Sequence, residues 1–211
     1  MNFIEAVKRP FQDVKTLIIG MIVMLIPIVN FTIGVGYFLD CARTSLKKKN
    51  TLPEFKDWGN LFMKGVGAFV ISLVYAIPVF IVLLLTIGST LLTGGVSALL
   101  NNGGLALLNA IATFSLGMVV TLVVALIIAI LSSAAMIRYA EKGNLGAAFE
   151  FVAVAKKAFS GTYLAAWVVS MVYTLLVVFV LSLIPFVGAM VAVFITGVTM
   201  YTLLAEAYKE A

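Results

Sequence analysis

Three long runs without a charged side chain constrain this sequence more than any other feature. They cover residues 16–39, 65–137 and 158–205, which are 24, 73 and 48 residues long. The chain is 63% hydrophobic and 11% charged, whereas a soluble domain is about 25% charged. A water-soluble fold of this size cannot bury so much apolar surface. The sequence therefore excludes a soluble domain, a disordered chain and a nucleic-acid binder, and it predicts an all-α polytopic membrane protein.

The positions of the basic residues indicate how many helices each run contains. A helix needs about 20 apolar residues to cross the hydrocarbon core of a bilayer, so residues 158–205 fit two helices, and residues 65–137 fit two with a long loop, or three. Lys and Arg gather on the cytoplasmic side of short-loop membrane proteins. An even number of crossings in every run places all 14 basic residues on that side. We therefore expect even numbers of helices, with both termini in the cytoplasm.

The first run allows two interpretations. A single helix through residues 16–39 would have Pro27 and Asn30 near its centre, and a proline removes a backbone donor and breaks a helix. Two helices of about 12 residues reach only about 18 Å each, so they must use flanking residues or cross the membrane in part. We favour a hairpin. The prediction is one membrane domain, residues 1–211, with six transmembrane helices as three hairpins at about 12–27 and 30–47, 64–88 and 112–139, and 161–183 and 189–208.

Three polar segments precede the hairpins, at about 1–11, 51–62 and 144–158, and we expect short interfacial helices there on the cytoplasmic side. In the second segment, Thr51 and Glu54 have the spacing of a capping box.

If a helix began at Thr51, then Phe55, Trp58 and Phe62 would share one face. Such an aromatic face suits the headgroup region of a membrane, which is the interpretation we prefer. Docking of a cytoplasmic protein is the alternative.

Two groups of residues form a recognisable pattern. The first is Pro10, Phe11, Pro27, Asn30, Gly36 and Tyr37, and the second is Leu52, Pro53, Glu54, Trp58, Phe62, Gly65 and Pro78, followed later by Pro185 and Gly188. In these positions the chain resembles the prokaryotic, largely archaeal membrane family catalogued as domain of unknown function 4013. The resemblance implies a multi-pass membrane protein and implies no activity. The chain departs from the family at Phe55, where Trp is usual, and at Asp40-Cys41, where a basic residue is commoner, so no lipid contact is carried over to that position.

The chemistry of the sequence gives little support to catalysis. The chain has no His, and no charged residue lies within a predicted membrane-spanning core. Proton-coupled transporters and intramembrane enzymes usually need such groups. Asp40, Glu54 and Asp57 would hold a divalent cation only if the fold brought them together, and solvated loop charges are the preferred interpretation. We expect no enzymatic activity, no metal and no cofactor.

Two further segments carry functional alternatives. The glycine-rich loop expected at 89–104 would re-enter the membrane as a pore lining, or, as we prefer, form a plain outer loop with a short surface helix. Lys47, Lys48 and Lys49 are the best candidates for contact with an anionic inner leaflet, although membrane insertion alone would explain them.

The sequence is compatible with three functions. The first is a non-enzymatic scaffold or accessory subunit of the cell membrane, with a protein partner at its cytoplasmic face or a second copy of itself. The second is a channel or facilitator for a small or lipid-like solute. The third, a membrane enzyme, is the least favoured.

Overall fold

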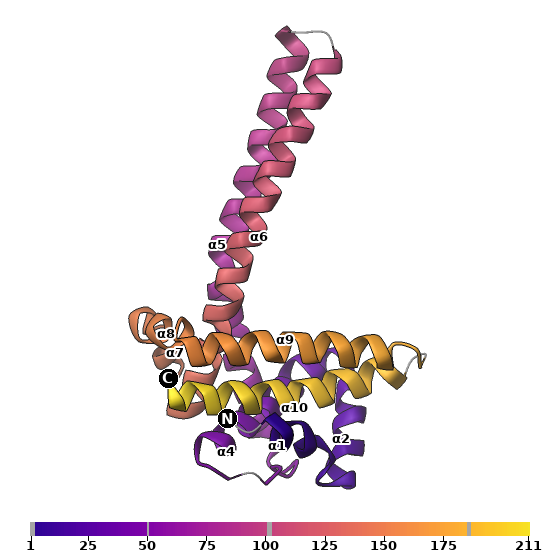
Figure 1. Ribbon diagram of the computed structural model, residues 1–211, viewed down its shortest axis with the longest axis vertical. Coiled ribbons are helices and arrows are strands. Elements are labelled where there is room, and N and C mark those ends of the chain that lie inside the picture. The colour runs from indigo at the N-terminus through magenta and orange to yellow at the C-terminus, as the bar shows by residue number, and fades with distance from the viewer. Residues whose placement is uncertain (1–2, 50, 101–102, 185–186) are drawn as a thin grey trace. The chain divides into compact units, whose positions relative to one another are not determined.

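A computed structural model describes residues 3–49, 51–100, 103–184 and 187–211, and within these ranges the chain is helical and contains no strand. The chain divides into two compact units, Met1–Ile71 with Leu131–Ala211 (unit 1) and Ser72–Ile130 (unit 2). Helices α5 (Trp58–Leu100) and α6 (Gly103–Lys142) contribute to both units. Figure 1 traces the helices in chain order.

Four helices are long and apolar enough to cross a membrane. They are α5, the segment Ala106–Lys142 of α6, α9 (Gly161–Leu181) and α10 (Val187–Glu210). A fifth candidate is the pair Val14–Leu25 and Pro27–Leu46, which passes the same criterion only when taken together and is bent by 115°. These helices agree with the all-helical membrane fold that the uncharged runs predict.

The bend in that pair follows from Pro27. Helix α2 (Val14–Leu25) is capped by Asp13, whose side chain accepts hydrogen bonds from the backbone N–H groups of Lys15 and Thr16. The residue that follows the helix, Ile26, is extended. Pro27 occupies the first turn of the next helix, where its missing N–H costs nothing. The second arm comprises α3 (Pro27–Val29), the π-helical turn η2 (Asn30–Gly34) and α4 (Val35–Leu46).

The core of unit 1 lies around α10. This helix packs along α9 and against α4 and α2, and Figure 1 shows α9 and α10 side by side. A Cβ atom on Gly188 would lie 1.8 Å from the backbone oxygen of Leu181, so glycine is required where the two helices meet. The buried cluster around α10 contains Val23, Met24, Tyr37, Phe38, Cys41, Leu61, Phe194 and Val198.

Short helices occupy two of the three polar segments. The first contains α1 (Phe3–Lys8) and the 3-10 turn η1 (Arg9–Phe11). The third contains α7 (Leu145–Ala148) and α8 (Phe151–Ala158). Gly143, with a φ of 69°, ends α6 in the left-handed conformation that glycine tolerates.

The second polar segment corrects our prediction of a helix beginning at Thr51. The described residues from Thr51 to Asp57 contain no helix, and α5 begins at Trp58. The cap is Asp57, whose Oδ1 accepts a hydrogen bond from the backbone N–H of Asn60 at 3.2 Å. Glu54 forms no capping box and instead pairs with Lys56 in an exposed ion pair at 2.6 Å.

Unit 2 is a helical hairpin and corrects our prediction of an outer loop at 89–104. Residues 89–100 belong to α5, and α6 begins at Gly103; Asn101 and Asn102 lie outside the described residues. Glycines within a helix cost about 1 kcal/mol each relative to alanine, but side-chain contacts between the two helices offset that cost. Thr93 Oγ1 lies 3.3 Å from Thr113 Oγ1, and Asn109 Nδ2 lies 3.1 Å from Ser97 Oγ.

Candidate functional site

The four charged segments of the sequence, 1–15, 40–64, 138–157 and 206–210, are joined by direct contacts within unit 1. Lys209 Nζ donates to the backbone oxygen of Leu46 at 2.7 Å, which ties the last segment to the second. Lys157 Nζ donates to the backbone oxygen of Tyr208 at 3.1 Å, which ties the third segment to the last. Arg138 donates to the Tyr208 hydroxyl at 3.3 Å. The charges that lie far apart in the sequence are therefore gathered in one region.

Arg9 ties the first segment into this region. Its side chain is 1% exposed, and the guanidinium lies among neutral oxygens. Nη1 donates to the backbone oxygen of Cys41 at 3.1 Å, to Thr202 Oγ1 at 2.8 Å and to Ser45 Oγ. Nη2 donates to Thr44 Oγ1 and to the backbone oxygen of Thr51 at 3.1 Å.

This arrangement around Arg9 is unusual in its charge balance. Each hydrogen bond from the guanidinium to a described residue ends on a hydroxyl or a carbonyl oxygen, and Nε is buried without a partner among the described residues. A buried cation is costly unless its donors are satisfied, so five acceptors from α4, α10 and the 51–57 segment must stay in place around it. Arg9 therefore acts as a structural joint between three parts of unit 1.

Tyr37 holds the segment from Leu52 to Asp57 against α4. Its side chain is completely buried, and its hydroxyl donates to the backbone oxygen of Pro53 at 2.8 Å. Its ring stacks on Phe55, with the ring centroids 4.0 Å apart and the planes 8° from parallel. Leu52 is fixed from the other side, because its backbone N–H donates to Gln12 Oε1 at 3.2 Å.

Two of the three glycines in the family pattern, Gly36 and Gly65, allow α5 to lie directly against the second arm of the bent pair. A Cβ atom on Gly36 would lie 2.0 Å from the backbone oxygen of Leu61. A Cβ atom on Gly65 would lie 1.8 Å from the backbone oxygen of Thr32. In lipid, small residues are what let helix backbones approach so closely. Gly36 on α4 and Gly65 on α5 thus lie on the two sides of a single helix crossing.

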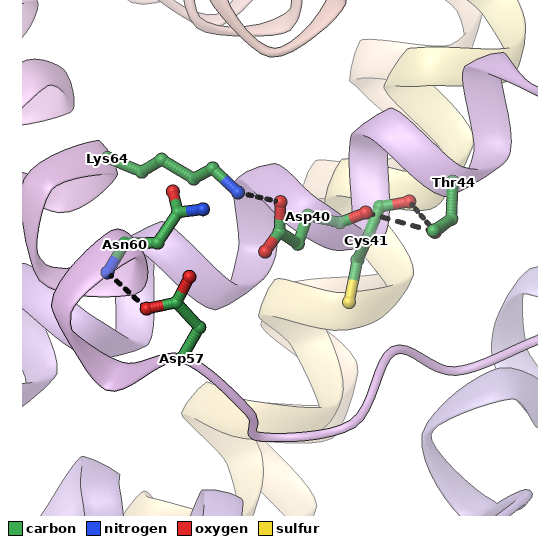
Figure 2. Close-up of polar contacts among 6 residues, drawn as sticks. All are labelled: Asp40, Cys41, Thr44, Asp57, Asn60 and Lys64. Carbon is green, nitrogen blue, oxygen red and sulfur yellow. Dashed lines mark hydrogen bonds and ion pairs between the residues drawn. The ribbon is translucent and has the colours of Figure 1, made fainter. Parts of the chain in front are cut away.

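A cavity of about 660 Å³ lies beside this crossing, entirely within unit 1. Its polar lining includes Lys64 and Asp40, which form an ion pair at 2.5 Å and whose side chains are 20% and 23% exposed. Arg43 and Lys142 also line it. Figure 2 shows Lys64 reaching from α5 to the carboxylate of Asp40 on α4.

The three carboxylates considered as a cation site have different partners. Asp40 pairs with Lys64, Glu54 pairs with Lys56, and Asp57 caps α5, as Figure 2 shows for Asp40 and Asp57. In the described part of the chain, no group of three His, Cys, Asp or Glu side chains is placed to hold a metal ion. The cation site is therefore not formed by these residues.

Lys47, Lys48 and Lys49 are exposed beyond the end of α4. The backbone N–H groups of Lys48 and Lys49 donate to the oxygens of Ser45 and Thr44, and Lys48 adopts a φ of 57°. Cations at a helix C-terminus interact favourably with the helix dipole. This local role exists whether or not the lysines contact lipid.

The remaining residues of the family pattern fall into several environments. Pro10 is buried, Phe11 and Phe62 are 54% and 44% exposed, and Pro78 lies inside α5. Pro185 lies outside the described residues.

Arg9, Lys64 and Arg138 are residues to which the sequence analysis assigned no role. Arg138 donates hydrogen bonds to the Tyr208 hydroxyl and to the Glu150 carboxylate, and these two bonds fix the end of α6. One signal in the sequence could have found two of them: Lys64 and Arg138 are the charges that border the 73-residue run. No comparable feature of the sequence indicates that Arg9 is buried.

Asp13, the cap of α2, has a pKa shifted by its hydrogen bonds. A hydrogen bond from the Thr16 side chain lowers the pKa of Asp13 below its ordinary value, because the bond favours the charged form. The cap of α2 is therefore ionised at neutral pH.

Comparison with known proteins identifies the family. A family model described as "Protein of unknown function (DUF4013)" matches residues 19–186, which include the pattern from Pro27 to Pro185. No curated protein and no solved structure matches the chain. Since the match covers most of the 211 residues, the resemblance seen in the sequence is confirmed: the chain belongs to the DUF4013 family of proteins of unknown function.

Proposed function

We propose that the protein is a non-enzymatic scaffold or accessory subunit of the cell membrane, which binds a protein partner through an aromatic surface next to the 51–57 segment. The observation that carries this proposal is the rigid support of that segment by Tyr37, described above, directly before an exposed Trp58. Trp58 is 46% exposed, and Phe62, about one helical turn further along α5, is 44% exposed. We call Trp58 and Phe62 the aromatic surface.

The support beneath the aromatic surface favours binding of a partner. The Phe55 ring lies between Tyr37 and Trp58, with its centroid 4.0 Å from the first and 5.8 Å from the second. An aromatic side chain on a rigid base loses little entropy on binding, and Trp residues dominate many interfaces. The alternative role is insertion of Trp58 and Phe62 into the headgroup region.

The topology that we propose has six membrane-embedded helices in three hairpins, with both termini in the cytoplasm. The contacts that join the four charged segments support this arrangement, because they favour one common side for those segments. The 115° bend at Ile26 supports a first hairpin that enters and leaves on the same side. With that hairpin, α5 with α6, and α9 with α10, every uncharged run contains an even number of passages. The short helices around α1, α7 and α8 would then lie at the cytoplasmic interface.

Substitution at Trp58 tests the docking role. The full-length protein and Trp58→Ala would be purified in mild detergent, and copurified subunits quantified by mass spectrometry. We expect a stoichiometric subunit with the natural protein and its loss from Trp58→Ala, with the melting temperature unchanged. Phe179→Ala is the matched control, because Phe179 on α9 is 70% exposed within an uncharged run. The proposal would be contradicted if Trp58→Ala retained the subunit. It would also be contradicted if no subunit copurified with any preparation, the natural protein included.

Phe55→Ala is a weaker test of the same idea. Phe55 stacks on Tyr37 and also lies near Phe194 at 6.5 Å between centroids. Its removal would loosen the support of the segment as well as the surface. Native mass spectrometry of the same preparations would report a second copy of the chain if the partner is the protein itself.

A channel or facilitator for a small or lipid-like solute is the second candidate. The cavity of about 660 Å³ favours it, because small-molecule sites commonly enclose about 300–1,000 Å³. Reconstituted proteoliposomes would show flux of solute or lipid above empty vesicles if this function is correct. We propose no catalytic role, since Asp40, Glu54 and Asp57 have separate partners.

A further inference from the structure

The cavity beside the Gly36–Gly65 crossing carries one inference that does not depend on the docking role. We propose that this cavity is a binding site for one anionic phospholipid, whose phosphate lies near Arg43 and Lys142 and whose acyl chain follows α5. The lining combines a cationic part and an apolar part. We call it the headgroup cavity.

The charged lining of the headgroup cavity favours an anion. Three cations, Arg43, Lys64 and Lys142, line it against one carboxylate, Asp40. Lys64 is already paired with Asp40 at 2.5 Å. The side chains of Arg43 and Lys142 are exposed, and neither has a hydrogen bond or ion pair with any residue that the structure describes. Two cations without a protein counter-ion therefore face the same space, and phosphate is a group that Arg binds well through paired hydrogen bonds.

Neutral polar groups complete the cationic part. Asn60, Asn144 and Tyr139 line the cavity and offer amide and hydroxyl donors. Oxygens of a phosphate or a glycerol would accept from them without further charge. A headgroup with several oxygens fits this lining better than a halide or a single carboxylate does.

The apolar part of the lining indicates a lipid and not a soluble phosphate ester. Met63, Val66 and Val70 recur at three- and four-residue spacing on α5, and all three line the cavity. Met63 is 64% exposed and Val70 is 38% exposed. A soluble anion would leave this strip in contact with water, whereas an acyl chain would cover it.

The position of the cavity along the chain also suits a lipid. Lys64 is the last charge before the 73-residue uncharged run, and Arg138 is the first charge after it. Apart from Leu39, Asp40 and Arg43 on α4, the lining residues come from the two borders of that run, at 60–70 and 139–145. In a membrane, such a border lies at the level of the headgroups, where a phosphate meets the first methylene groups.

Lipid competition in native mass spectrometry tests the proposal on the full-length protein. The protein in mild detergent would receive equal amounts of phosphatidylglycerol and phosphatidylcholine with identical acyl chains. We expect one retained phosphatidylglycerol, preferred by about tenfold or more over phosphatidylcholine. The double variant Arg43→Gln/Lys142→Gln should lose this preference. The control Lys8→Gln/Lys156→Gln removes the same charge at exposed positions outside the cavity and should change the preference by less than about twofold.

Two further measurements keep the test independent of misfolding and identify the source of the phosphate. Asp40→Asn frees Lys64 and removes the carboxylate that opposes an anion, so lipid retention should rise by about threefold or more. Inorganic phosphate at millimolar concentration should fail to displace the lipid. Equal retention of the two lipids by the natural protein, an equal loss in the Lys8→Gln/Lys156→Gln control, reduced retention by Asp40→Asn, or displacement by inorganic phosphate would each overturn the proposal.

Discussion

Unit 1 and unit 2 are held together by different kinds of contact. Every charged residue of the chain lies outside Ser72–Ile130. Unit 1 contains the buried Arg9, the ion pair between Lys64 and Asp40, and the glycine crossing. The two helices of unit 2 meet through hydroxyl and amide groups, as between Thr86 and Thr121, whose Oγ1 atoms are 3.4 Å apart.

The difference teaches where the structure tolerates change. In a membrane, apolar side chains gain little free energy by moving from lipid into a helix interface, because both surroundings are apolar. Helix association therefore depends on close packing and polar contacts. Unit 1 concentrates both kinds of contact in a few residues. Unit 2 spreads weak contacts along two helices, and its apolar side chains, such as Leu84, Leu91 and Leu99, are largely exposed. Substitutions in unit 1 should therefore cost more than chemically similar substitutions in unit 2.

The largest effect is expected at Arg9. Arg9→Ala removes the donors shared by Thr44, Ser45, Thr51 and Thr202. We expect a loss of about 3 kcal/mol or more in unfolding free energy, because each buried acceptor left without a donor costs about 1–3 kcal/mol. Thermal melting in detergent would measure it.

Two variants make the Arg9 prediction specific. Lys8→Ala, next to it and exposed, should melt like the natural protein. Arg9→Lys keeps the charge but cannot reach five acceptors with one ammonium group, so it should recover only a small part of the loss. An Arg9→Ala protein that melts normally would show that the joint is dispensable.

A matched pair of glycine substitutions compares the two units directly. Gly65→Ala in unit 1 would place a Cβ atom 1.8 Å from the backbone oxygen of Thr32 and should cost about 2 kcal/mol or more. Gly95→Ala in unit 2 meets no atom within 4 Å and should gain up to about 1 kcal/mol from helix propensity. The measurement is the change in melting temperature of each variant relative to the natural protein. Equal changes would contradict the expected difference between unit 1 and unit 2.

A smaller effect is expected from Tyr37→Phe. The substitution removes the hydroxyl that donates to Pro53 and leaves the ring stacked on Phe55. Loss of one buried hydrogen bond should cost about 1 kcal/mol and should make the 51–57 segment more sensitive to limited proteolysis. Tyr173→Phe is the control, since the Tyr173 ring contacts Phe3 elsewhere in unit 1. If the proteolytic pattern is the same for both variants, Tyr37 does not hold the segment.

The smallest effect is expected from Thr121→Val in unit 2. The change removes the contact with Thr86 but keeps the shape of the side chain. Hydrogen bonds between membrane helices average about 0.6 kcal/mol, so the melting temperature should fall only slightly. A loss larger than that of Tyr37→Phe would mean that unit 2 depends on single polar contacts as much as unit 1 does.

Several features were predictable from the sequence because they follow from local rules. The uncharged runs identified the apolar helices, and Pro27 marked the point where the first pair bends. The loop at 89–104 was mispredicted, because glycine and threonine are weak helix formers by themselves and only the facing residues, such as Thr113 and Asn109, stabilise a helix there. The capping box at Thr51 was mispredicted for a similar reason. Tyr37 and Arg9, both distant in sequence, hold that segment in a non-helical conformation.

The sequence by itself determined the class of this protein, since charge-free runs of 24, 73 and 48 residues leave only a lipid-compatible helical chain. It also determined the family, through residues that lie mostly between Pro27 and Pro185. Only the tertiary structure decided which charges meet, that Arg9 is buried, and that Arg43, Lys64 and Lys142 line one cavity. The physical reason is distance along the chain: apolar length and helix breaking are local properties, whereas burial and charge pairing depend on residues brought together from segments as far apart as Arg9 and Thr202.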